Sequence, residues 1–246
     1  MSQDIDAALY AWNFKPGSVK ARLIRAGNGR EVLQMRVDLG VLQMETSGRP
    51  DGARPHGCPT YFDYLRRQAR AAARQGQELV LSEEQCREAD REFVQFYHRR
   101  ISWLALRQFD RAVADADHTL EFMDFVRDHS PSEEYTQAHE QYRGFVWFHR
   151  TQAAVARAIE RKNPEEAIDE IRGGLEKLRA FFVSFDAEEH MKEDSMVQQL
   201  LQLEKSLRET HGIEATLHEQ LDQAVAREDY ETAAKLRDAL RRRPEE

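Results

Sequence analysis

The sequence predicts a mostly α-helical protein with a small β-hairpin or meander near the N-terminus and a helical hairpin near the C-terminus. From residue 60 almost to the end, apolar residues recur at intervals of three and four, as on the buried face of a helix. Residues 19–44 instead hold short β-compatible runs around an Asn-Gly pair. We therefore expect a small basic β-rich module with a Pro/Gly loop over 1–59, a helical domain over 60–212 and a helical hairpin over 213–246.

Composition favours a charge-rich protein without a membrane span. Of the 246 residues, 33% are charged and 41% are hydrophobic, and there is no run of 18 apolar residues. The first residues, MSQDIDAALYAW, contain neither the basic segment nor the apolar segment of a secretion signal. Cys58 and Cys86 lie far apart and outside any CxxC pair, so we expect no structural disulfide and a reducing cytoplasmic location.

Charge is distributed unevenly along the chain. Residues 12–74 contain 12 Lys and Arg against 5 Asp and Glu, which gives +7. Residues 75–246 contain 24 against 37, which gives −13. This asymmetry predicts a basic N-terminal third attached to an acidic helical body.

The β-rich module is predicted from one turn signal. Runs of β-compatible residues at 19–24 and 32–37 flank Asn28-Gly29. Asn-Gly between two such runs is a strong signal for a tight hairpin. A third run over residues 39–44 extends the prediction to a small meander.

Residues 47–59 contain three Gly and three Pro residues, which excludes regular structure. This Pro/Gly loop is either a connector between sheet and helix or a binding segment. In the second interpretation, Arg49, Arg54 and the neighbouring backbone N–H groups hold a phosphate or carboxylate.

A basic stripe is predicted on a helix over residues 61–74. Its arginines recur at intervals of three and four, which places them on one helix face: Arg66, Arg67, Arg70 and Arg74. The stripe either pairs with the acidic body or binds nucleic-acid phosphates. In the nucleic-acid interpretation the basic residues of the β-rich module contribute as well: Lys20, Arg22, Arg25, Arg30 and Arg36.

Local signals place the remaining helices. Ser82 with Gln85 forms a capping box that begins a helix, Pro131 ends another, and Asn163-Pro164 begins a third. Together with the apolar periodicity, these signals predict helical segments over residues 83–107, 110–128, 132–161, 164–185 and 186–210.

Two segments resemble the tetratricopeptide repeat (TPR). QFDRAV at 108–113 and NPEEAI at 163–168 are similar to the turn and second-helix start of that repeat, with Ala112 and Ala167 at its small position. Arg100 stands at the small position of the preceding helix. The resemblance implies TPR-like helical hairpins in the middle of the chain that present a groove for a peptide or a partner helix.

The C-terminal residues predict a short αα-hairpin. Apolar residues at helical spacing occupy two stretches on either side of a polar turn at 228–230: Leu217, Leu221, Ala224 and Val225, then Tyr230, Ala233, Ala234, Leu236 and Leu240. The small alanines allow the two helices to approach closely. A hairpin of this size buries too little apolar area to offset its ordering entropy comfortably, so it packs on its own domain or on a partner.

Residues 224–238, AVAREDYETAAKLRD, resemble the UVR motif. That motif forms the C-terminal hairpin of UvrB and the matching segment of UvrC, and it also occurs in bacterial Clp-type chaperones and McsA adaptors. The resemblance implies protein–protein contact, usually between two such hairpins, with an excision-repair or Clp-type quality-control partner. On this chain it implies an apolar contact surface with a polar rim: Leu217, Leu221, Tyr230, Ala233, Leu236 and Leu240, with Arg237 and Asp238 at the rim.

The sequence contains none of the common catalytic motifs. Gly-rich phosphate loops, HExxH, G-x-S-x-G and a zinc quartet are all missing. Carboxylates lie near His at Asp115/His118 and Glu214/His218, but without the paired Glu-x-x-His motifs of a di-metal bundle. We therefore predict a non-enzymatic adaptor without metal or cofactor, and a nucleic-acid-associated factor as the alternative.

Overall fold

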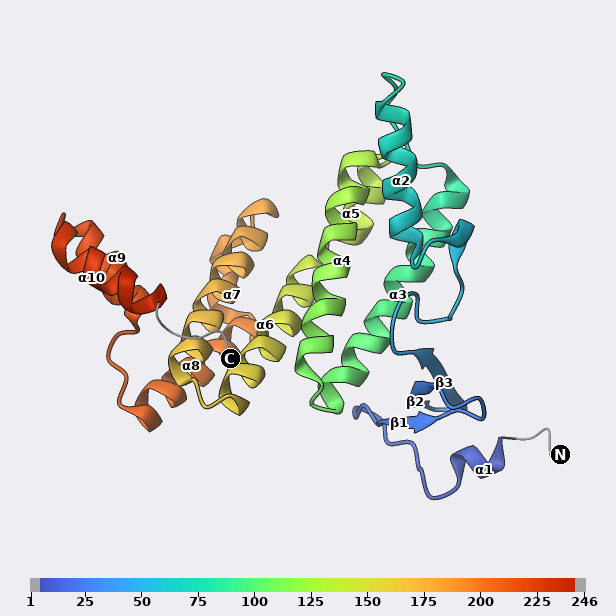
Figure 1. The fold of residues 1–246 in the computed structure, drawn as a ribbon, viewed down its shortest axis with the longest axis horizontal. Coiled ribbons are helices and arrows are strands. Elements are labelled where there is room, and N and C mark those ends of the chain that lie inside the picture. Colours follow the sequence, from blue (N-terminus) through green and yellow to red (C-terminus); the bar gives the residue numbers. More distant parts are fainter. Residues whose placement is uncertain (1–4, 242–246) are drawn as a thin grey trace. The chain divides into compact units, whose positions relative to one another are not determined.

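The computed structural model describes residues 5–241 and confirms the predicted fold class (Figure 1). Helices dominate within this range, with a small antiparallel sheet near the N-terminus and a helix pair near the C-terminus. The chain forms two compact units, residues 1–153 and 154–246, with the boundary inside helix α6. The predicted boundaries at residues 59 and 212 lie within these units and stay predictions.

The sheet forms around the predicted Asn-Gly turn. Its antiparallel strands follow in the order β1-β2-β3, with bounds Ala21–Arg25, Glu31–Val37 and Gly40–Glu45, after a short helix α1, Asp6–Leu9. Leu33 pairs with Leu23 on one side and with Met44 on the other, so three apolar side chains share one face. Gly29 has a φ of +83° in the β1–β2 turn, a conformation that favours glycine. The predicted meander is confirmed.

Helices α3 (Glu83–Ala105) and α4 (Phe109–His129) pack together and hold the end of the sheet. Arg99 of α3, which is 4% exposed, donates from Nε and Nη2 to both carboxylate oxygens of Asp115 at 2.8 and 2.7 Å. Its Nη1 donates to the backbone oxygens of Glu45 and Gly48 at 3.1 and 2.8 Å. One buried guanidinium therefore fixes strand β3 to both helices.

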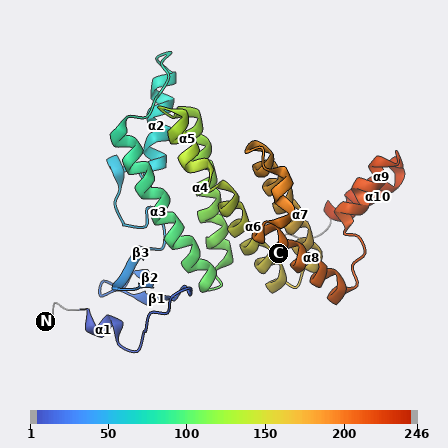
Figure 2. The ribbon, with the colours of Figure 1, turned by 180° about the vertical axis from the view of Figure 1, so that it is seen from behind.

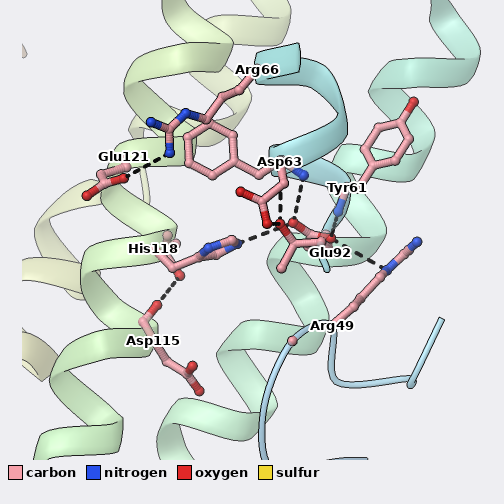
Figure 3. A network of polar contacts seen from close by, with 12 residues as sticks. Arg49, Tyr61, Asp63, Arg66, Glu92, Asp115, His118 and Glu121 are labelled. Atoms are coloured by element: carbon pink, nitrogen blue, oxygen red, sulfur yellow. Dashed lines mark hydrogen bonds and ion pairs between the residues drawn. The ribbon is translucent and has the colours of Figure 1, made fainter. Parts of the chain in front are cut away.

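A buried carboxylate, Glu92 of α3, holds the start of helix α2, Tyr61–Ala73 (Figure 3). Its side chain is 0% exposed and accepts hydrogen bonds from the backbone N–H groups of Tyr61 at 2.6 Å and Phe62 at 3.1 Å. These first N–H groups of α2 have no acceptor within the helix, and a negative charge is favourable at that end. His118 Nε2 of α4 lies 3.2 Å from the same carboxylate.

The Pro/Gly loop lies against the helices through Arg49. The Arg49 side chain is 3% exposed and forms ion pairs with Glu88 at 2.9 Å, Asp51 at 3.5 Å and Glu92 at 3.6 Å. This differs from the expectation of an arginine that holds an external anion, because carboxylates of the chain itself already surround the guanidinium. Arg49 thus supports the interpretation of the loop as a connector.

Helix α2 covers α3 and α4 with its apolar face. Thr60 caps it by accepting from the Asp63 N–H group at 3.1 Å, and Phe62 stacks on Phe122 of α4 with ring centroids 4.8 Å apart. The core that results has these buried members: Tyr61, Phe62, Leu65, Leu81, Cys86, Ala89, Phe122 and Val126.

The segment predicted as one helical unit over 132–161 consists of two helices, α5 (Glu133–Glu140) and α6 (Arg143–Glu160). The Tyr142 N–H group bonds to the His139 oxygen at 2.9 Å, an i to i−3 bond that tightens the last turn of α5 and ends it. An apolar pattern alone does not separate one long helix from two consecutive helices, so the prediction missed this break.

In the second unit, helices α7 (Pro164–Ser184) and α8 (Ser195–His211) pack side by side (Figure 2). The prediction of one charged helix over 186–210 is wrong, because a 3-10 helix, η2 (Glu188–Glu193), precedes α8. Asp194 interrupts the helix by accepting from the N–H groups of Met196 and Val197 at 2.9 and 3.1 Å, as an N-cap does.

The other predicted helices agree with the structure within a few residues, while the TPR-like character of the middle of the chain stays a prediction. Among the described helices, none combines the length and the apolar character that a bilayer crossing requires.

We expect Glu92→Gln to lower the free energy of unfolding by about 3 kcal/mol, because it removes the charge that faces the start of α2 and Arg49. Urea denaturation followed by circular dichroism measures the change. Glu121→Gln is the control, since that carboxylate is 65% exposed and lies 3.9 Å from Arg66, and a change below about 1 kcal/mol is expected. Equal losses in the two variants would contradict the importance of Glu92.

Candidate protein-interaction site

The C-terminal helices α9 (Leu217–Ala226) and α10 (Tyr230–Arg241) form the predicted hairpin. A capping box begins α9: the Thr216 side chain accepts from the Glu219 N–H group at 3.3 Å, and Glu219 accepts from the Thr216 N–H group at 2.7 Å. Asp229 begins α10 by accepting from the Thr232 N–H group at 3.1 Å. Hydrogen bonds from the Thr232 side chain, and then from its N–H group, lower the pKa of the Asp229 carboxyl below its ordinary value.

The two helices meet along small side chains. Ala224 of α9 and Ala233 of α10 are buried, at 6% and 8% exposure. Alanine at the contact allows the helix axes to approach closely, as the sequence predicted. Among the described residues of the two helices, only these two alanines are buried.

The rest of the apolar surface stays partly open. The leucines predicted to contact a partner are only half-buried: Leu217, Leu221, Leu236 and Leu240. Tyr230 is 69% exposed at the start of α10, and Val225 is 53% exposed at the end of α9. Within residues 5–241 this apolar surface is thus left incomplete, which is the property that a docking surface needs.

The predicted polar rim is exposed. Arg237 Nη2 lies 3.3 Å from Asp238 Oδ1, with the two side chains 55% and 51% exposed. Lys235 and Glu231 form an i, i+4 ion pair at 2.6 Å on the same helix. Such exposed pairs contribute little stability. Arg237 and Asp238 can therefore leave each other and pair with charged groups of a partner at a small cost in free energy.

The start of the hairpin is anchored within the second unit. Asp169 of α7 accepts a hydrogen bond from Thr216 Oγ1 at 2.6 Å and lies 2.6 Å from His218 Nδ1. Arg208 of α8 donates to both carboxylate oxygens of Glu219 at 2.7 and 3.1 Å. The sequence analysis did not identify these anchoring residues. The Thr-x-x-Glu capping box was an available signal for Thr216 and Glu219, but no sequence signal indicated Asp169.

Several basic residues predicted as anion contacts hold the N-terminal segment instead. Lys20 donates to the Asn13 oxygen at 2.7 Å, and Arg36 donates to the Trp12 oxygen at 2.9 Å. Arg22 donates to the Ala8 oxygen at 3.0 Å and lies over the Trp12 ring, with its Cζ 4.0 Å from the centroid. In the nucleic-acid interpretation, these Lys and Arg donors would instead point toward phosphates outside the protein.

The remaining basic candidates divide into two groups. Arg30 pairs with Glu45 at 3.0 Å, Arg66 with Glu121 at 3.9 Å, and Arg67 donates to the His56 oxygen at 3.2 Å. The second group is exposed, and its side chains have no hydrogen bond or ion pair among the described residues: Arg25, Arg54, Arg70 and Arg74. The predicted pairing of the α2 stripe with acidic residues is therefore seen for Arg66 alone among the residues described.

Within residues 5–241, no three His, Cys, Asp or Glu side chains gather as a metal site requires. The carboxylate–histidine pairs noted in the sequence have other partners. Asp115 binds Arg99, His118 lies beside Glu92, and His218 lies beside Asp169.

Comparison with protein families identifies the hairpin. Residues 215–242 match the family model of the UvrB/uvrC motif, UVR. The comparisons with curated proteins and with solved structures found no match. The chain is thus a mostly helical protein that carries a UVR motif, and the motif coincides with α9 and α10.

We expect the anchor of the hairpin to depend on pH. Burial raises the pKa of Glu219, but hydrogen bonds from Arg208 and from the Thr216 N–H group outweigh it, so the pKa lies below its ordinary value. A lowered carboxyl pKa contributes stability that is present above the unfolded value, about 4.3, and lost as the pH falls through the folded value. Glu219→Gln should therefore lower the Tm at pH 7, with a difference that becomes smaller as the pH falls below about 4.

Glu231→Gln is the matched control, because its carboxylate is 82% exposed in an i, i+4 pair. Its Tm should follow that of the unsubstituted protein at pH 7 and at pH 3. A Glu219→Gln difference of equal size at pH 7 and pH 3 would contradict the role assigned to the charge.

Proposed function

We propose that the protein is a non-enzymatic cytoplasmic adaptor that docks through the α9–α10 hairpin. The observation that carries the proposal is the UVR motif on a hairpin whose leucines stay partly exposed beside the exposed Val225 and Tyr230. Leu217, Leu221 and Leu236 would supply buried contact area, and Tyr230 would supply an aromatic anchor at the start of α10.

The partner class follows from the motif. UVR motifs occur in excision-repair proteins and in Clp-type chaperones, and the motif implies contact that is usually between two such hairpins. A partner hairpin would cover the leucines and bring its own charged residues to Arg237 and Asp238. We therefore propose a bacterial UVR-containing or Clp-type partner.

The test uses purified UvrB and a purified UVR-containing Clp chaperone as probes. We expect the full chain to bind one of them, and Tyr230→Ala to weaken that binding about tenfold or more, because aromatic anchors dominate interface energies. Tyr230 is 69% exposed, so its replacement should change the free energy of unfolding by less than about 0.5 kcal/mol.

Tyr10→Ala is the matched control, since Tyr10 is 84% exposed and lies outside the hairpin. It should bind as the unsubstituted chain does. Retention of the partner by a chain that lacks residues 213–246 would move the interaction to another surface and reject the adaptor proposal.

A second candidate function rests on the exposed arginines of α2. Arg70 and Arg74 are exposed and have no ion pair among the described residues, and Arg67 lies on the same helix. Such a stripe could contact phosphates of DNA or RNA. The net charge of −8 for the chain opposes this reading, since the acidic body would repel the backbone.

Salt-dependent binding separates the two functions. The adaptor proposal predicts weak binding to DNA and RNA at low salt and little change as salt increases, because few phosphate contacts exist to lose. A steep loss of affinity with salt, abolished by joint replacement of Arg66, Arg67, Arg70 and Arg74 with Gln, would establish the nucleic-acid function instead.

A further inference from the structure

The first unit contains an apolar cavity of ≈ 490 Å³ among helices α3, α4, α5 and the start of α6. Its size lies within the roughly 300–1,000 Å³ range of small-molecule sites. The apolar walls include Phe93, Met123 and Val146. Further large apolar or aromatic side chains that line the cavity are exposed: Val94, Tyr97, Tyr142 and Phe145. Exposed apolar area around a cavity is typical of a binding site.

One charged side chain of this cavity, Arg100 of α3, is almost fully buried. It is 2% exposed and lines the cavity together with Thr119. Its Nη1 donates to Thr119 Oγ1 at 3.1 Å, and its Nε donates to His149 Nδ1 at 3.4 Å. Its Nη2 has no hydrogen-bond partner among the described residues.

Both hydrogen-bond partners of Arg100 are uncharged at neutral pH. Burial, and then the nearby guanidinium, lower the pKa of His149 to about 4, so its ring is neutral. Burial also lowers the pKa of Arg100, to about 10, although Asp115 opposes the shift. Arg100 therefore keeps its positive charge at pH 7 beside two neutral groups.

The carboxylates around Arg100 are engaged elsewhere. Asp115 binds the guanidinium of Arg99 through both of its oxygens. Asp90, which lines the same cavity, accepts from Tyr135 Oη at 2.8 Å and lies 3.0 Å from His139 Nε2. Arg100 thus has no ion pair within residues 5–241, and a buried charge without a counter-charge is costly. The same side chain stands at the position where the TPR resemblance implies a small residue.

We propose that this cavity binds a small amphipathic carboxylate, with an aliphatic tail among the apolar walls and a carboxylate that accepts hydrogen bonds from Arg100. The tail suits Phe93, Met123 and Val146, and the head group supplies the counter-charge that the chain does not. An alcohol of the same length would gain the apolar contacts without the ionic one, and a cationic amphiphile would be repelled. The site is independent of the α9–α10 hairpin.

Isothermal titration calorimetry with decanoate, 1-decanol and decyltrimethylammonium tests the proposal on the full chain. Decanoate should bind at least about tenfold more tightly than 1-decanol, since the two share the aliphatic tail and only the carboxylate can form an ion pair with Arg100. Decyltrimethylammonium should bind more weakly than either. Failure of decanoate to bind, or equal affinity for decanoate and 1-decanol, would overturn the proposal.

Variants separate the charge from the cavity. Arg100→Met should remove the preference for decanoate while 1-decanol still binds, and Arg70→Met, an exposed arginine of α2, should leave both affinities unchanged. Ala138→Trp places a large ring at the cavity lining and should abolish binding of both ligands with the circular dichroism spectrum unchanged. If Arg100→Met does not fold, Ala138→Trp decides alone: decanoate binding that survives it would place the ligand elsewhere and reject the site.

Discussion

An apolar helix face must be covered, and two helices packed side by side cover only part of each other. The first unit meets this constraint with a third helix. Helix α2 lies over α3 and α4 with Phe62 stacked on Phe122, and the buried Glu92 carboxylate holds the start of α2 in place. In the C-terminal hairpin, by contrast, Leu221 and Leu236 stay half-buried within the described chain. The proposed docking role is the consequence of that difference.

Local sequence signals predicted the hairpin and the sheet well. The UVR-like run, the alanine pair and the Asn-Gly turn each act over a few neighbouring residues, so the sequence alone identifies them. The two missed helix breaks, before Arg143 and at Asp194, depend on details of hydrogen bonding that an apolar pattern does not record. Glu92 could not be predicted as buried, because its role depends on backbone N–H groups about thirty residues away in the chain.

The basic N-terminal third shows why a charge count does not define a binding surface. Arg22 and Arg36 hold backbone oxygens of the N-terminal segment, and Arg49 is surrounded by carboxylates of the chain. Arg100 is the opposite case. It is a single buried charge in the wall of an apolar cavity, and the proposed ligand site depends on it rather than on an exposed stripe of charges. The sequence signal for Arg100 was its position in a helix where a small residue was expected.

Hydrogen–deuterium exchange of residues 217–240, with and without the UVR-containing partner, tests the docking account most directly. In the free chain we expect the amides of α9 and α10 to exchange faster than those of α3 and α4, because less apolar area protects them. Addition of the partner should slow exchange across both hairpin helices. Slow exchange in the free chain that the partner leaves unchanged would show that the hairpin is already complete and would contradict the account.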